Sequence, residues 1–72
     1  MRKTFKLEDL DCANCAAKME HSIKKIDGVN DATVSFMTQK LALDADDARF
    51  DAILDEVVRV CKKIEPDMVI VR

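Results

Sequence analysis

Residues 3–28 read KTFKLEDLDCANCAAKMEHSIKKIDG, and the spacing of the apolar residues changes within this stretch. Over residues 1–8, Phe5 and Leu7 alternate with polar residues, which predicts a strand with one buried face. Residues 9–14 are polar and break the alternation. Beyond them the apolar residues recur at the spacing of one helix face, at Ala16, Met19, Ile23 and Ile26. The stretch therefore predicts a strand, a polar loop and an amphipathic helix.

The rest of the chain repeats these two patterns, the alternation of a strand and the spacing of a helix face. Gly28 suits a left-handed cap that would end the first helix. Alternating residues then predict strands at 32–36 and around 41–43, joined by a bend at 37–40 and followed by an acidic turn at 44–47. A second helical stripe runs from Phe50 to Ile64 and stops before Pro66, and residues 68–71 form an apolar run. This β-α-β-β-α-β order predicts an α+β, ferredoxin-like sandwich: a four-stranded antiparallel sheet with two helices on one face.

Composition excludes several function classes. Seventy-two residues make one domain, predicted to span 1–72, and 49% of the residues are hydrophobic, enough for a packed core. The net charge of −2 and the lack of a basic block argue against a nucleic-acid partner. RNA-binding domains of similar element order also need exposed aromatics on their central strands, which this chain lacks. No apolar run approaches the roughly 18 residues of a membrane span, so we expect a soluble, cytoplasmic chain without membrane insertion.

The functional prediction rests on Cys12 and Cys15. The chain has three cysteines, and an odd number favours free thiols over a disulfide framework. Two cysteines three positions apart, between a strand and a helix start, can direct both sulfurs at one point, and the helix N-terminus favours thiolates. Thiolates select soft or borderline cations. Only two ligands are certain, fewer than the four of a closed zinc site, which suits an ion that is passed on.

At this point the sequence resembles the heavy-metal-associated domain family. Residues 10–16, LDCANCA, are similar to its metal-binding loop, and all 72 residues follow its element order. Asp9, Leu10 and Asp11 stand where the copper-type loop carries Gly, Met and Thr. An Asp directly before the first Cys is similar to the branch that exports zinc, cadmium and lead, as is the segment 62–67. The resemblance implies the cytosolic metal-binding domain of a heavy-metal-transporting P-type ATPase, a binding domain and not itself an enzyme.

Ligand chemistry gives Asp11 two alternative roles. Cu(I) accepts two thiolates, whereas Zn(II), Cd(II) and Pb(II) take further ligands, and Asp11 could supply a carboxylate oxygen. The same side chain could instead cap the helix that follows. We therefore expect Zn(II), Cd(II) or Pb(II) at this site, with Cu(I) as the alternative. The expected partners are the cation and either the transmembrane part of an ATPase or a metal-donor protein.

Four further alternatives stay open. Cys61 is either a buried core residue or an additional metal ligand, because its helix ends at the edge where the cysteine loop is expected. The chain could also be a free-standing copper or zinc metallochaperone, or a metal buffer. A thiol–disulfide oxidoreductase shares the C-x-x-C spacing, but here Ala13-Asn14 lies between the cysteines and no Trp precedes them. We expect a monomer, with a metal-bridged dimer as the alternative.

Overall fold

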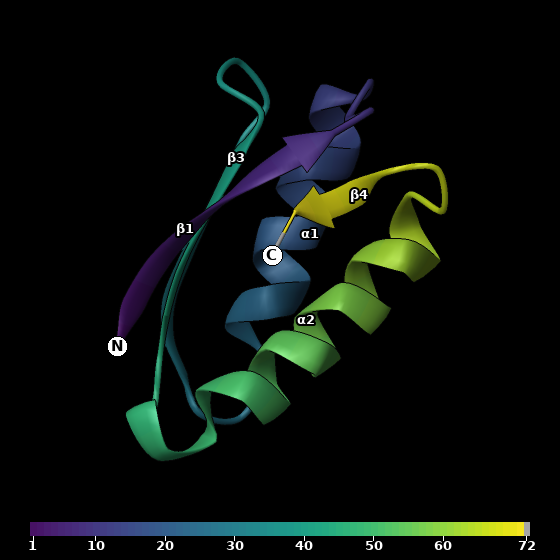
Figure 1. The fold of residues 1–72 in the computed structure, drawn as a ribbon. Helices are drawn as coiled ribbons and strands as arrows, with labels where there is room; N and C mark the ends of the chain where they lie inside the picture. The colour runs from purple at the N-terminus through teal and green to yellow at the C-terminus, as the bar shows by residue number, and fades with distance from the viewer. Residues whose placement is uncertain (72) are drawn as a thin grey trace.

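The computed structural model describes residues 1–71; Arg72, the last residue of the predicted domain, lies outside the described residues. Both helices pack on one face of the sheet (Figure 1). No helix within residues 1–71 is long and apolar enough to cross a membrane. The predicted ferredoxin-like sandwich is confirmed. Its elements are β1 (Arg2–Glu8), α1 (Ala13–Lys24), β2 (Val29–Ser35), β3 (Lys40–Ala45), the short 3-10 helix η1 (Asp47–Arg49), α2 (Phe50–Ile64) and β4 (Val69–Val71).

The sheet is antiparallel throughout, in the order β2-β3-β1-β4. Strand β1 is therefore paired on both sides. Its Phe5 lies opposite Leu41 of β3, and its Leu7 lies opposite Ile70 of β4. This register places the apolar residues of neighbouring strands on the same face, the one that the helices cover.

The core lies between that face and the helices. The α1 stripe buries Ala16, Met19 and Ile23, and the α2 stripe includes Val57, which has no exposed surface. Fully burying one such aliphatic side chain contributes about 1.5–3 kcal/mol. By the alternation of β1, Lys3 points to the same face as Phe5 and Leu7. It is nevertheless exposed, and its Nζ lies over the edge of the core, 5.7 Å from the centroid of the Phe50 ring.

Two predicted boundaries are wrong. Helix α1 ends at Lys24, before the predicted Gly28 cap, because the amides of Lys25 and Ile26 bond to carbonyls three residues earlier and tighten the last turn. Gly28 is left-handed, with φ +94°, but it belongs to the following turn. In the second strand, Phe36 falls outside β2 and is 36% exposed, because the hairpin begins to turn there.

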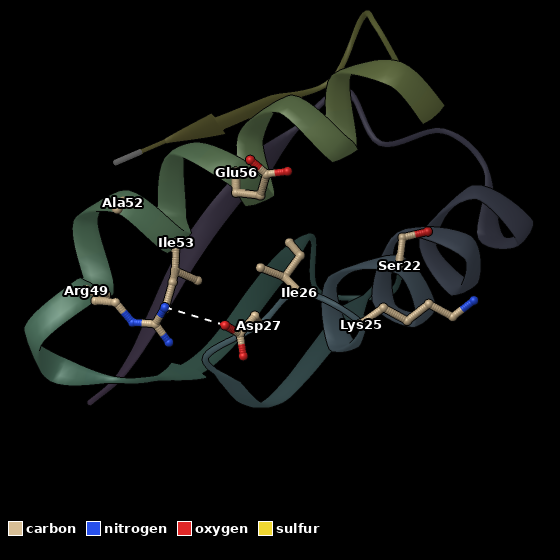
Figure 2. Close-up of a pocket in the computed structure, with 8 residues that line it drawn as sticks. All are labelled: Ser22, Lys25, Ile26, Asp27, Arg49, Ala52, Ile53 and Glu56. Carbon is tan, nitrogen blue, oxygen red and sulfur yellow. Dashed lines mark ion pairs between the residues drawn. The ribbon is translucent and has the colours of Figure 1, made fainter.

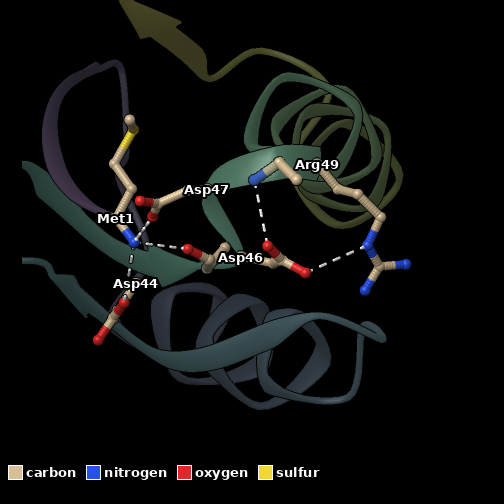
Figure 3. Close-up of polar contacts among 7 residues, drawn as sticks. Met1, Asp44, Asp46, Asp47 and Arg49 are labelled. Carbon is tan, nitrogen blue, oxygen red and sulfur yellow. Dashed lines mark hydrogen bonds and ion pairs between the residues drawn. The ribbon is translucent and has the colours of Figure 1, made fainter.

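The acidic segment 44–47 is tied to neighbouring groups. The Met1 amine donates to the Ala45 carbonyl at 2.8 Å and pairs with Asp44 at 3.8 Å and with Asp47 (Figure 3). The hydrogen bond with Asp47 is the main cause that raises the pKa of this amine. Asp46 accepts from the Ala48 amide at 3.1 Å and so caps η1. These contacts hold the turn between β3 and α2 against the start of β1.

Gly28 gives a stability prediction. A Cβ at this position would lie 2.6 Å from an Arg49 nitrogen and 2.7 Å from Cδ1 of Ile53, in addition to the strain of φ +94°. Arg49 occupies this space while pairing with Asp27 at 3.6 Å (Figure 2). We expect Gly28→Ala to lower the free energy of unfolding by about 1–2 kcal/mol in urea titrations. Asp27→Ala, in an exposed ion pair, should change it by less than about 1 kcal/mol.

Candidate metal centre

The loop before the cysteines turns sharply at Asp9. Its φ is +62°, in the left-handed region that Asp tolerates better than most residues. The turn redirects the chain from β1 so that Leu10 enters the core, where it is 2% exposed. Leu10 therefore anchors the loop from below, and its side chain supplies packing and no chemistry.

Gln39, in the β2–β3 hairpin, holds the backbone of the same residue. The Leu10 amide donates to Gln39 Oε1 at 3.1 Å, and Gln39 Nε2 donates to the Leu10 carbonyl at 2.7 Å. Gln39 Nε2 also donates to the Phe36 carbonyl at 3.0 Å, within the hairpin. Sequence reasoning missed Gln39, because the two partners are 29 positions apart and no local pattern marks the contact.

The two cysteines stand at the start of α1. Cys12 is the N-cap, with extended backbone, and its carbonyl accepts the first helical hydrogen bond, from Ala16 at 3.1 Å. Its sulfur accepts from the Cys15 amide at 3.3 Å, in the position that an oxygen usually fills. The alternative that Asp11 caps the helix is therefore wrong, because the helix begins at Ala13 and Cys12 takes that place. The Asp11 side chain is exposed.

The two thiols differ in acidity. The hydrogen bond with the Cys15 side chain lowers the pKa of Cys12, and the Cys15 amide adds to this effect. The same hydrogen bond, followed by burial, raises the pKa of Cys15 to about 11. Cys12 is therefore the more acidic of the two thiols, and Cys15 is the one that holds its proton more tightly. A metal ion that takes both sulfurs must displace the Cys15 proton, so binding should weaken as pH falls.

Glu65 is a second residue that sequence reasoning missed. It follows the end of α2, and its carboxylate lies close enough to the cysteines to add to the raised pKa of Cys15 and to oppose, without reversing, the lowered pKa of Cys12. The segment 62–67 was singled out in the sequence, but only the placement of α2 brings Glu65 to the cysteine loop. Within residues 1–71, no three His, Cys, Asp or Glu side chains are gathered closely enough to form a ready-made metal site.

The structure places Cys61 in the core. It is 1% exposed, and burial raises the pKa of its thiol to about 11. The position agrees with the α2 stripe, in which Cys61 follows Val57 by one turn. Cys12 and Cys15 are also free thiols but are only half-buried. The three cysteines thus divide into an accessible pair and an enclosed single thiol.

A pair of accessible thiols where the first strand of a βαββαβ sandwich leads into the first helix defines a small thiolate-type metal-binding domain. The family model described as "Heavy-metal-associated domain" matches residues 4–65, and the chain belongs to this family.

Among curated relatives, the chain is 31% identical over 70 residues to the cadmium, zinc and cobalt-transporting ATPase of Bacillus subtilis, covering 97% of the chain and 10% of that protein. It is 44% identical over 45 residues to the zinc/cadmium/lead-transporting P-type ATPase of Escherichia coli, covering 62% of the chain and 6% of that protein. The chain thus spans a tenth or less of these relatives. Among solved structures, it is similar to the N-terminal domain of a potential copper-translocating P-type ATPase from Bacillus subtilis in the Cu(I)-loaded state. The TM-score is 0.73 and the identity 25%, over 89% of the chain and 78% of that domain.

The thiol geometry predicts an order of alkylation. With limiting iodoacetamide near pH 7, Cys12 should react first because its pKa is lowered, and Cys15 should follow. Cys61 should be protected until the protein unfolds. Peptide mass spectrometry at successive times measures the order, and a sample in denaturant, where all three should react alike, is the control. Early labelling of Cys61 would contradict the assignment.

Cys61 also predicts a loss of stability at high pH. Its thiol should ionise near pH 9 in the unfolded chain but near 11 when folded, so the unfolded chain loses its proton first. The protonated Cys61 thiol therefore stabilises the folded protein fully below pH 9. As pH rises toward 11 this contribution is lost, and the free energy of unfolding falls by about 2 kcal/mol. Urea unfolding at pH 7.5 and pH 10.5 measures the loss. Cys61→Ala should cost about 1 kcal/mol at pH 7.5 and show a smaller fall between the two pH values.

Proposed function

We propose that this chain is the metal-binding domain of a heavy-metal-transporting P-type ATPase and takes up a divalent cation of the zinc, cadmium or lead type. The observation that carries the proposal is the half-buried pair Cys12 and Cys15 at the start of α1, with Asp11 directly before Cys12 in the chain and Glu65 near Cys15. The relatives named above, which transport such cations, support the choice of ion. The chain itself would bind and release the cation, and ATP hydrolysis would belong to other parts of the parent protein.

Charge and coordination number favour a carboxylate beside the thiolates. Two thiolates neutralise a divalent cation but leave coordination positions that Zn(II) and Cd(II) fill with further ligands. A carboxylate oxygen suits these borderline ions, whereas Cu(I) prefers sulfur. The loop therefore has the chemistry for a site of two sulfurs and at least one oxygen.

Two residues compete for the oxygen position. Asp11 lies directly before Cys12, between the anchored Leu10 and the helix cap. Glu65 lies near Cys15, where its charge adds to the raised pKa of that thiol. Either carboxylate needs a local movement to join both sulfurs, because the described residues hold no preformed cluster of three ligands. We propose that Asp11 is the first of these ligands, and that Glu65 adds a second oxygen or replaces it during transfer.

The exposed position of the loop fits transfer by ligand exchange. A partner thiol or carboxylate can approach the cation while Cys12 and Cys15 still hold it. We propose that the partner is the membrane part of the parent ATPase or a metal-donor protein, that transfer takes place on the cytoplasmic side, and that the chain acts as a monomer.

A copper function is the second candidate. The Cu(I)-loaded domain named above shares the fold of this chain at 25% identity. In this alternative the chain would be a copper-carrying domain or a free-standing metallochaperone, with Cys12 and Cys15 as the only ligands. Cu(I) would then bind without help from either carboxylate.

A competitive titration distinguishes the candidates. The reduced protein is titrated with Zn(II), Cd(II) and Cu(I) against chelators of known affinity, beside the variants Asp11→Asn and Glu65→Gln. We expect one divalent cation per chain and a loss of Zn(II) affinity of at least about 10-fold for a carboxylate that binds the ion. Cu(I) affinity should be nearly unchanged in both variants.

Asp67→Asn is the matched control, because Asp67 is an exposed acid in the same α2–β4 connection as Glu65. An equal loss in all three variants would show that net charge matters and that no carboxylate is a ligand. Strong retention of Cu(I), with divalent binding that neither Asp11→Asn nor Glu65→Gln alters, would support the copper candidate instead. Sedimentation of the loaded protein tests for a metal-bridged dimer.

A further inference from the structure

The hairpin residue Gln39 continues the sheet where the backbone ladder stops. Strands β1 and β3 pair up to Lys6 and Lys40, and one more backbone bond joins the Leu7 amide to the Gln39 carbonyl at 2.7 Å. Beyond this point β1 ends and the chain turns at Asp9. The side-chain amide of Gln39 then continues the pairing, because its Oε1 accepts and its Nε2 carries two N–H donors, one for Leu10 and one for Phe36.

The two bonds to Leu10 fix the backbone from both sides of that residue. Gln39 Oε1 accepts from the Leu10 amide at 3.1 Å, and Gln39 Nε2 donates to the Leu10 carbonyl at 2.7 Å. Gln39 is itself held, because its Nε2 donates to the Phe36 carbonyl and its backbone is left-handed, with φ +55°. The contact is therefore between two constrained segments, and Leu10 cannot shift without breaking at least two hydrogen bonds.

This restraint lies next to the ligands. Leu10 is two positions before Cys12, and Cys12 is fixed in turn as the cap of α1. Asp11 is the single residue between the two anchors. Burial of the Leu10 side chain fixes its depth, and the Gln39 bonds fix the direction in which the chain leaves toward Asp11 and Cys12.

The geometry points to Gln39 as a positioning residue of the metal centre, which preorganises the Cys12 loop from the opposite hairpin without touching the cation. This inference rests on the proposed function, because it concerns the loop that would carry the ion. A loop held in its binding conformation loses less conformational freedom when the cation binds. Residues that orient metal ligands typically change metal affinity by about 10- to 100-fold when they are replaced.

Gln39→Met tests the inference, because it keeps a similar length and removes both the donor and the acceptor. Ser35→Ala is the matched control in the same hairpin: it removes the Ser35 Oγ acceptor of the Thr38 amide, at 3.3 Å, and leaves Leu10 untouched. Zn(II) and Cd(II) affinities are measured by chelator competition at a temperature where melting curves show every variant folded. We expect about 10-fold weaker binding for Gln39→Met and no change for Ser35→Ala.

Amide exchange in the metal-free protein is the second readout. The Leu10 amide should exchange faster in Gln39→Met than in the wild type, and should exchange at the wild-type rate in Ser35→Ala. Because coupling is reciprocal, Zn(II) should slow exchange of the Leu10 amide more in the wild type than in Gln39→Met, which lacks the acceptor of that amide. A purely structural role would lower the melting temperature without changing metal affinity or this response.

Three results would overturn the inference: unchanged affinity in Gln39→Met, unchanged Leu10 exchange, or equal affinity losses in Gln39→Met and Ser35→Ala. Failure of the proposed function looks different, because the wild type itself would then bind neither Zn(II) nor Cd(II). In that case the Leu10 exchange rate still reports whether Gln39 holds the loop.

Discussion

The pairing of β1 with two neighbours is the constraint on which the rest of the structure depends. Because β3 and β4 bind its two edges, the strand cannot slip without moving its inward residues to the solvent face. Its end therefore marks one defined point at the edge of the sheet. The chain leaves that point through Asp9 and Leu10, so the register of β1 determines where Cys12 lies. The hairpin and the end of α2 reach the same edge because antiparallel strands and crossing helices alternate in direction (Figure 1).

Much of this arrangement follows from the spacing of apolar residues. The α1 and α2 stripes predicted the helices, and the alternation around Phe5 and Leu41 predicted strands that do pair. The ends of elements were less predictable. Gly28 has the positive φ that its identity suggested, but the helix stops earlier because two amides bond three residues back. Cys12 is the helix cap, a role that a preference for oxygen acceptors offered to Asp11 as one of two alternatives.

The residues that surround the cysteines were harder to find, and the reason is physical. Gln39 acts through its side-chain amide on the backbone of Leu10, 29 positions away. Nothing in the sequence distinguishes it from the other polar residues of the hairpin. Glu65 reaches Cys15 only because α2 ends where it does. Local periodicity predicts which residues are buried, but side-chain contacts between segments require the packed arrangement. The cysteine pair itself was predictable, because its chemistry and its place between a strand and a helix are both local.

The separation between core and loop has an evolutionary consequence. Leu10, Val57 and Cys61 are buried and carry the fold, whereas Asp11 is exposed and Glu65 only half-buried. Substitutions at these two acids, the oxygen ligands in the proposed function, remove no core packing, so under that proposal they change ion preference at little cost in stability. A lineage could therefore exchange one cation for another through one or two surface changes, while the scaffold that presents the thiols stays the same.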